Sequence, residues 1–277
     1  MTRQPEAKHG GVRAITSLQN DRIKAIRALD MRKARRESGQ FIAEGTSVLV
    51  TARDAGWSPA TLVFLAGSLR DGIGRDLLTW AERAGAECLE VSPAVLAKVA
   101  AKDNPQTVLA VFDQRWTNTP GAQAVPSDAL WVVLEAIRDP GNLGTIIRTA
   151  DAVGANGVML VGNSADPYSR ESVRASMGSI FNVPVAHAEL AEFVTWASQW
   201  PGDVVGTHLR ATDDFRKPYR LPALLVMGSE GPGLSPEATR ACTRLVKIPM
   251  TGRIDSLNIA VATALVLYEM RKARLVL

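Results

Sequence analysis

Short apolar runs alternate with helix-like segments along almost the whole chain, and this alternation limits what the chain can fold into. In the second half we expect apolar strands at residues 130–134, 158–161, 203–207, 223–227 and 245–248. Helical patterns accompany them at residues 142–153, 168–177, 190–199, 236–242 and 256–272. Strands this apolar, joined through helices, indicate an α/β fold with a mostly parallel sheet covered on both faces.

The first half repeats the alternation on a smaller scale. We expect helices at residues 20–37, 45–55, 76–84 and 93–100, and strands at residues 40–43, 61–66, 87–91 and 108–112. Residues 115–128 contain two prolines and no apolar periodicity, which is typical of a linker. The sequence therefore predicts a smaller α/β domain at 1–114, a linker at 115–128 and a second domain at 129–277.

Composition excludes several classes of protein. Hydrophobic residues make up 46% of the chain, which is enough to form real cores. The apolar stretch 257–270 is too short for a membrane span, and residues 1–10 lack the apolar core of a secretory signal, so we expect a cytoplasmic protein. The few cysteines and histidines are scattered without metal-ligand spacing, so we expect no metal; they are Cys88, Cys242, His9, His187 and His208.

Positive charge is concentrated near the N-terminus. The net charge is +4, and residues 1–115 carry 17 Lys and Arg against 13 Asp and Glu. Much of the excess lies in one segment, in which seven basic residues accompany the single acid Asp30: Arg22, Lys24, Arg27, Arg32, Lys33, Arg35 and Arg36. Such a segment is either a phosphate-binding element or simply the solvated face of a helix.

A turn and a helix with one unusual arginine follow strand 130–134. Residues 139–141 read Asp-Pro-Gly, a tight turn, and Asn142 is a candidate cap for the next helix. We expect that helix to be largely covered, so Arg148, which follows two isoleucines, needs an anion. A neighbouring carboxylate and a substrate phosphate both meet that need.

A glycine-rich loop follows strand 223–227, with the sequence Gly-Ser-Glu-Gly-Pro-Gly at residues 228–233. Gly228 and Gly233 let the backbone pass close to a ligand, and Ser235 is a good cap for the next helix. The loop is not a nucleoside-triphosphate loop, because Leu234 stands where the lysine is required. A turn alone does not require the carboxylate of Glu230.

The last loop, residues 247–258, precedes an apolar helix. Ser256 is a good N-cap, which is a sufficient structural reason for a serine there, whereas Asn258 in the first turn has no such reason. Each loop alone is weak evidence for a function.

Together, the three loops resemble the three motifs of the SpoU/TrmH family of RNA ribose 2′-O-methyltransferases, in the SPOUT superfamily. The motifs are N-x-G-x-x-x-R-x-A at residues 142–150, G-S-E-G-x-G at 228–233, and I-P-M with S-L-N at 248–250 and 256–258. The resemblance extends weakly to residues 41–45 and 104–106, which are similar to the substrate-binding domain of some members. Asp255 departs from the family pattern, where glutamate or serine is more common.

The resemblance implies a C-terminal SPOUT domain whose chain end forms a trefoil knot, and S-adenosylmethionine as cofactor. Carried over by motif position, the cofactor-binding residues are Gly228, Gly233, Ile248, Met250 and Leu257. The catalytic residues carried over in the same way are Arg148, with Asn142, Glu230, Ser256 and Asn258 completing the site.

The implied reaction transfers the cofactor's methyl group to a ribose 2′-hydroxyl in structured RNA. Because an arginine side chain stays protonated at neutral pH, we expect Arg148 to anchor a phosphate and to stabilise the developing oxyanion. Glu230 or a phosphate oxygen is the candidate proton acceptor. The implied assembly is a homodimer through the C-terminal domain. The basic segment then gains a role in binding RNA, through Arg22, Lys24, Arg32, Lys33, Arg35 and Arg36.

A separate N-terminal domain favours 23S ribosomal RNA as the substrate, with transfer RNA as the alternative. Two other classes stay open: a non-catalytic RNA-binding protein with the same fold, and a methyltransferase acting on a base or a small molecule. A dehydrogenase or kinase is disfavoured, because the chain lacks the phosphate-loop signatures.

Overall fold

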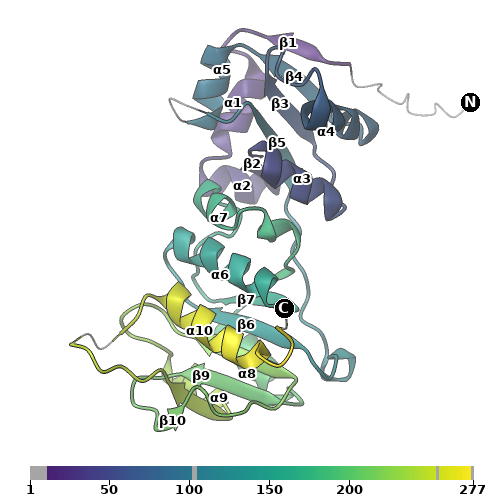
Figure 1. Ribbon diagram of the computed structural model, residues 1–277. Coiled ribbons are helices and arrows are strands. Elements are labelled where there is room, and N and C mark those ends of the chain that lie inside the picture. The colour runs from purple at the N-terminus through teal and green to yellow at the C-terminus, as the bar shows by residue number, and fades with distance from the viewer. Residues whose placement is uncertain (1–10, 102–104, 254–255, 276–277) are drawn as a thin grey trace, which may run out of the picture. The chain divides into compact units, whose positions relative to one another are not determined.

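The computed structural model describes residues 11–101, 105–253 and 256–275 (Figure 1). The expectations for residues 1–10, His9 and Asn104 among them, and for Asp255 therefore lie outside the described residues. The chain divides into two compact units. The first comprises residues 1–114 together with Tyr168–Arg174, and the second comprises Arg115–Pro167 and Ala175–Leu277.

The first unit is built on a five-stranded mixed sheet in the order β1-β4-β3-β5-β2. Strands β1, β4 and β3 are parallel, while β5 runs antiparallel to both β3 and β2. The strand bounds are β1 Arg13–Ile15, β2 Gln40–Glu44, β3 Thr61–Leu65, β4 Glu87–Val91 and β5 Val108–Asp113. The helices are α1 Asp21–Ala28, α2 Arg32–Ser38, α3 Thr46–Asp54, α4 Gly72–Arg83 and α5 Pro93–Ala100.

Alternating strand residues divide the core of this unit into two layers. Ile42, Val63 and Leu89 pack against α1 and α5. On the strands' other side, the rings of Phe41 and Phe112 pack at 5.8 Å between centroids, with Trp57 edge-on to both. Helices therefore cover both faces of this sheet.

The expected helix at residues 20–37 is wrong, because the structure has two helices there. Helix α1 ends at Ala28, and α2 begins at Arg32. The guanidinium of Arg35 turns back to the break, where its Nη1 donates to the carbonyl oxygens of Leu29 (2.8 Å) and Asp30 (2.9 Å). Arg35 is only 5% exposed, so it satisfies backbone carbonyls that an unbroken helix would satisfy with its own N–H groups.

The second unit is built on a seven-stranded sheet in the order β10-β12-β9-β11-β6-β7-β8, in which every pair of neighbours is parallel. The strands are β6 Leu130–Glu135, β7 Gly157–Val161, β8 Val185–Ala188, β9 Asp203–Thr207, β10 Asp213–Asp214, β11 Ala223–Met227 and β12 Arg244–Lys247. The helices are α6 Pro140–Ala152, α8 Leu190–Ser198, α9 Pro236–Ala241 and α10 Ile259–Arg271, with 3-10 turns at Ala122–Ala124 and Ser179–Phe181. The expected α/β class with a parallel sheet is confirmed.

Helices cover both faces of this sheet as well. Trp131, Val133 and Met159 pack in one cluster with Phe193 of α8 and Ala238 of α9. Helices α6 and α10 pack against each other, and α10 also packs on β11. Figure 1 shows α6 and α10 lying side by side along the strands.

Two segments depart from the expected division of the chain. The predicted linker 115–128 belongs to the second unit, where Thr117 N donates to Val185 O (2.9 Å) and Trp196 Nε1 donates to Pro120 O (2.9 Å). Residues 168–174, which include most of helix α7 (Arg170–Ala175), belong to the first unit. There the ring of Tyr168 packs against that of Phe41 with the centroids 4.7 Å apart and the rings tilted by 44°, and Arg170 Nε pairs with Asp30 Oδ1 at 2.6 Å.

Candidate active site

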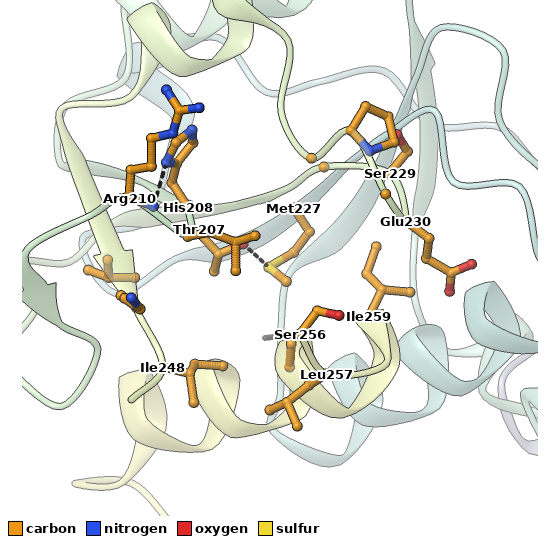
Figure 2. Close-up of a pocket in the computed structure, with 18 of the residues that line it drawn as sticks. Thr207, His208, Arg210, Met227, Ser229, Glu230, Ile248, Ser256, Leu257 and Ile259 are labelled. Atoms are coloured by element: carbon orange, nitrogen blue, oxygen red, sulfur yellow. Dashed lines mark hydrogen bonds between the residues drawn. The ribbon is translucent and has the colours of Figure 1, made fainter. Parts of the chain in front are cut away.

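The carboxyl ends of four neighbouring parallel strands bring separate loops to one edge of the second sheet. The loops follow β6, β9, β11 and β12. Three of them, after β9, β11 and β12, surround a cavity of about 460 Å³ (Figure 2). The cofactor-binding residues expected from the sequence all line this cavity: Gly228, Gly233, Ile248, Met250 and Leu257.

The glycine-rich loop after β11 is folded too tightly for side chains at its start. A Cβ atom on Gly228 would lie 2.1 Å from the carbonyl carbon of Gly233, so position 228 admits only glycine. An isolated bridge pairs Ser229 with Gly233, and Gly231 and Gly233 have φ angles of 96° and 75°. The loop therefore presents backbone rather than side chains along much of the cavity wall.

A chain of hydrogen bonds links the three motif loops. Asn258 Nδ2 donates to Asn142 Oδ1 at 3.0 Å, and Asn142 Nδ2 donates to Glu230 Oε1. Asn258 is itself fixed, because its Oδ1 accepts from the backbone N–H groups of Ala260 (2.9 Å) and Val261 (3.3 Å) at the start of α10. The orientation of the Glu230 carboxylate is thus set by residues 88 and 28 positions away in the sequence.

A polar hollow adjoins the mainly apolar cavity beside these hydrogen-bonded residues. Asp139, Asn142 and Asn258 line the hollow alone, while Glu230, Gly231, Ser256 and Leu257 line both spaces. Glu230 and Ser256 therefore stand between an apolar space and a polar one. A ligand bound in the cavity and a polar molecule bound in the hollow would meet beside these two residues.

Two helix caps differ from those expected. Asp139, not Asn142, caps α6, since its Oδ1 accepts from Asn142 N at 2.6 Å. Asn258, not Ser256, caps α10, which begins at Ile259. The side chains of Asn142 and Ser256 are therefore not used as helix caps, and both line the hollow. Ser235 caps α9 as expected, accepting from Ala238 N at 3.1 Å.

Arg148 does not lie where the sequence suggested. Helix α6 buries Leu143, Ile146 and Ile147, but Arg148 is exposed on its open face. Within residues 11–101, 105–253 and 256–275 no hydrogen bond or ion pair involves its guanidinium, and it lines neither the cavity nor the hollow. The expectation that Arg148 is covered is wrong, because the buried face of α6 is formed by Ile146, Ile147 and Ala150 and does not include Arg148.

Sequence reasoning missed the part of the site contributed by β9. Thr207, His208 and Arg210 line the cavity, and Thr207 Oγ1 donates a hydrogen bond to Met227 Sδ at 3.5 Å on the neighbouring strand β11 (Figure 2). Thr207 is the last residue of a predicted strand and the other two follow it, and that position at the carboxyl end of a strand is the signal by which they could have been found.

The basic segment is mostly committed to contacts within the first unit. Arg22 pairs with Glu87 at 2.6 Å, Lys24 with Asp21 at 3.1 Å, and Lys33 with Glu37 at 3.8 Å. Arg35 is buried and bound to backbone carbonyls, so its expected role in binding RNA is wrong. Arg32 and Arg36 are exposed.

The cysteines do not supply a nucleophile to the site. Burial raises the pKa of the Cys242 thiol to about 12 and that of Cys88 to about 11, so both stay protonated at neutral pH. Neither lines the cavity. Among the residues that the structure describes, no cluster of His, Cys, Asp and Glu could hold a metal ion, and no helix is long and apolar enough to span a membrane.

Comparisons with known proteins agree with this geometry. Residues 129–268 match the model of the SpoU rRNA Methylase family, and residues 20–110 match that of the MRM3-like substrate binding domain.

The chain is also similar to known proteins over nearly the whole length of both chains. The crystal structure of an AdoMet-bound rRNA methyltransferase from Sinorhizobium meliloti superposes with a TM-score of 0.87 at 40% identity, covering 96% of this chain and 99% of that one. The 23S rRNA (uridine(2479)-2'-O)-methyltransferase of Streptomyces viridochromogenes is 33% identical over 99% of this chain and 97% of its own. The 23S rRNA (guanosine(2553)-2'-O)-methyltransferase RlmP of Bacillus subtilis is 29% identical over 94% of this chain and 100% of its own.

Proposed function

The chain belongs to the SpoU rRNA methylase family, and we propose that it transfers the methyl group of S-adenosylmethionine to a ribose 2′-hydroxyl of 23S ribosomal RNA. The observation that carries this proposal is the hydrogen-bonded chain Asn258–Asn142–Glu230, placed where the apolar cavity meets the polar hollow. A binding protein that had lost catalysis would have no need to orient a carboxylate there. The proposed substrate places the reaction in the cytoplasm.

The cavity suits S-adenosylmethionine in size and chemistry. Ile248, Leu257 and Ile259 offer apolar contacts for an adenine ring, and the loop at 228–233 offers backbone donors and acceptors. A volume of about 460 Å³ lies in the range of small-ligand pockets. When bound, the cofactor supplies a methyl group on a sulfonium, which is already a good leaving group, so the protein needs to align the acceptor and manage its proton.

Glu230 is the residue that handles the proton of the ribose hydroxyl. Asn142 occupies its Oε1, which leaves Oε2 to accept a hydrogen bond from a hydroxyl in the hollow. Ser256 and Asn142 line the same hollow and help to orient the ribose.

Arg148 anchors a phosphate of the RNA. Its guanidinium is exposed on the same helix as Asn142, and a guanidinium binds phosphate in a bidentate manner that lysine cannot reproduce. Arg32 and Arg36 in the first unit supply further, sequence-independent phosphate contacts, and so does Lys33, whose side chain stays exposed despite its pair with Glu37.

The protein acts as a homodimer through α10. Val261, Leu265 and Tyr268 follow each other at helical spacing and are 50%, 41% and 50% exposed, which forms an apolar strip on one helix face. The strip borders a broad hollow that Phe215 and Leu275 also line. An apolar strip of this kind is typical of a surface that is covered by another protein.

The C-terminal part of the second unit forms the trefoil knot of its family. Supporting this, residues that precede α10 and the loop at 228–233 line one and the same cavity, so the two segments run close together although β12 and α9 separate them in sequence.

The test is methyl transfer from labelled S-adenosylmethionine to unmodified 23S ribosomal RNA and transfer RNA, followed by nucleoside mass spectrometry. We expect a 2′-O-methyl nucleoside in the ribosomal RNA, loss of at least ~100-fold in rate with Arg148→Ala, and little rescue by Arg148→Lys. Arg240→Ala, an exposed arginine of α9 outside the site, is the matched control. A methylated base, or product in transfer RNA alone, would contradict the proposal, and full activity of Arg148→Lys would contradict the bidentate contact.

A further inference from the structure

The cavity carries opposite charges on its two sides. Glu230 stands on one side, and Arg210 lies with His208 on the other, as Figure 2 shows. Among the described residues that line the cavity, Glu230 is the one acid, while Arg210 and Lys247 are cationic. A ligand with both a cationic and an anionic group would therefore bind in a fixed orientation.

The backbone around Arg210 is held in place by His208. The N–H of His208 donates to Val246 O at 3.0 Å, which fixes this residue to the end of β12. Its Nδ1 accepts from the N–H of Arg210 at 3.1 Å, and its carbonyl accepts from the N–H of Ala211 at 3.1 Å. In the part of the chain that the structure describes, the guanidinium of Arg210 makes no hydrogen bond or ion pair and is free to bind an anion.

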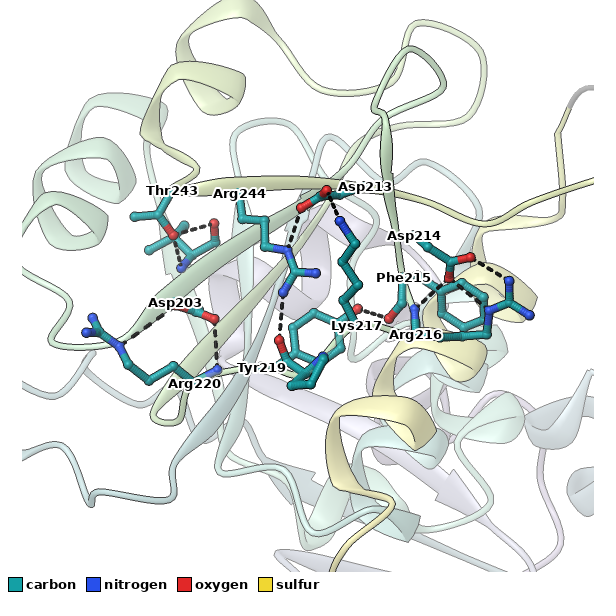
Figure 3. A network of polar contacts seen from close by, with 12 residues as sticks. Asp203, Asp213, Asp214, Phe215, Arg216, Lys217, Tyr219, Arg220, Thr243 and Arg244 are labelled. Carbon is teal, nitrogen blue, oxygen red and sulfur yellow. Dashed lines mark hydrogen bonds and ion pairs between the residues drawn. The ribbon is translucent and has the colours of Figure 1, made fainter.

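Arg244 holds the rest of the segment between β9 and β11 in place through several side-chain contacts (Figure 3). Arg244 Nε pairs with Asp213 at 3.2 Å, its Nη1 donates to Pro218 O at 2.8 Å, and its guanidinium lies 5.0 Å from the ring centroid of Tyr219. Lys217 pairs with the same Asp213 at 2.5 Å. A loop fixed in this way loses little backbone entropy when a ligand binds, so the backbone that carries Arg210 is preorganised.

We infer that Arg210 binds the carboxylate of the amino-acid part of S-adenosylmethionine. This inference rests on the proposed function. The carboxylate is the one anionic group of that cofactor, and beside Glu230 it would be repelled. At Arg210 it meets a cation that has no ion-pair partner within residues 11–101, 105–253 and 256–275, in a charge-assisted and potentially bidentate hydrogen bond. The arrangement keeps the Glu230 side of the cavity for the cationic sulfonium and its methyl group.

The experiment compares two ligands that differ by the carboxylate alone. Binding of S-adenosylmethionine and of its decarboxylated analogue is measured by calorimetry on the full-length protein and on Arg210→Ala. We expect the substitution to weaken S-adenosylmethionine about tenfold or more and to leave the decarboxylated analogue unchanged within about twofold. The affinity of Arg210→Lys for S-adenosylmethionine should lie between that of the unaltered protein and that of Arg210→Ala.

Arg220→Ala is the matched control, because Arg220 lies in the same loop, pairs with Asp203 and lines neither the cavity nor the hollow. It should bind both ligands like the unaltered protein. Equal weakening of both ligands by Arg210→Ala, or unchanged binding of both, would overturn the role of Arg210. Failure of the unaltered protein to bind S-adenosylmethionine would instead overturn the proposed function itself.

Discussion

The side-chain amide of Asn142 joins two loops by using both of its ends. It accepts a hydrogen bond from Asn258 and donates one to Glu230. An aspartate could accept but not donate, and an aliphatic residue could do neither. The chemistry of an amide, rather than its size, is therefore what this position requires.

We predict that Asn142→Ala lowers kcat about 10- to 100-fold and leaves the Kd for S-adenosylmethionine within about twofold, because Asn142 lines the polar hollow and not the cavity. Methyl transfer kinetics and calorimetry measure the two quantities separately. Thr145→Ala, one turn along the same helix, removes a hydroxyl that bonds only to Gly141 O in the described structure, and it should retain the kcat of the unaltered protein. A large rise in Kd with unchanged kcat would show that Asn142 supports the cofactor instead.

The sequence predicts which of these residues act together, but not how each is placed. Asn142, Glu230, Ser256 and Asn258 do meet, because they follow the carboxyl ends of parallel strands. The cap assignments failed because Asp139 and Asn142 are equally good capping residues, as are Ser256 and Asn258, and only the start of each helix decides between neighbours. Whether Arg148 is buried or exposed depends on which face of α6 packs against the rest of the unit, and a shift of that face by one residue would bury Arg148.

At the scale of the element, the break between α1 and α2 shows where periodicity misleads. Ile23, Ile26 and Leu29 keep helical spacing up to the break, so the apolar pattern alone gives one continuous helix. What ends α1 is a side chain six residues further on, since Arg35 bonds to the carbonyl of Leu29. Strands β1, β8 and β10 were missed for a related reason, because they are only two to four residues long and carry too little pattern.

We predict that Arg35→Ala lowers the free energy of unfolding of the first unit by about 1–3 kcal/mol, because it leaves the carbonyls of Leu29 and Asp30 without their shared donor. Hydrogen exchange across β2 and α2 reports this change locally. Arg36→Ala is the matched control for stability, since Arg36 is the exposed neighbour.

The same pair separates folding from RNA binding. Arg36→Ala should weaken binding of ribosomal RNA fragments, with a smaller salt dependence, while its unfolding stays unchanged. If Arg35→Ala left hydrogen exchange untouched, the bridge between the two helices would not be what stabilises the break.

At the scale of the whole molecule, the apolar strip on α10 determines the proposed assembly. We predict that Leu265→Lys shifts the protein from dimer to monomer at micromolar concentration, because it places a charge in the middle of that strip. Light scattering coupled to size exclusion gives the mass directly. Ile73→Lys, an exposed aliphatic residue of the first unit that is 57% accessible, should leave the mass unchanged. A monomeric unaltered protein would remove the dimer from the proposal.

Residues 168–174 bear on the order in which the protein matures. They are encoded inside the second unit, yet Tyr168 is 1% exposed and completes the aromatic core around Phe41 in the first. A ribosome delivers the chain from its N-terminus, so the first unit leaves the exit tunnel with a gap in its core. That gap stays open until residue 174 has been translated, when five strands of the second unit, β8 to β12, are still to come. The first unit therefore cannot be completed before part of the second has been translated, and a genetic truncation after residue 114 would leave the first unit without Tyr168.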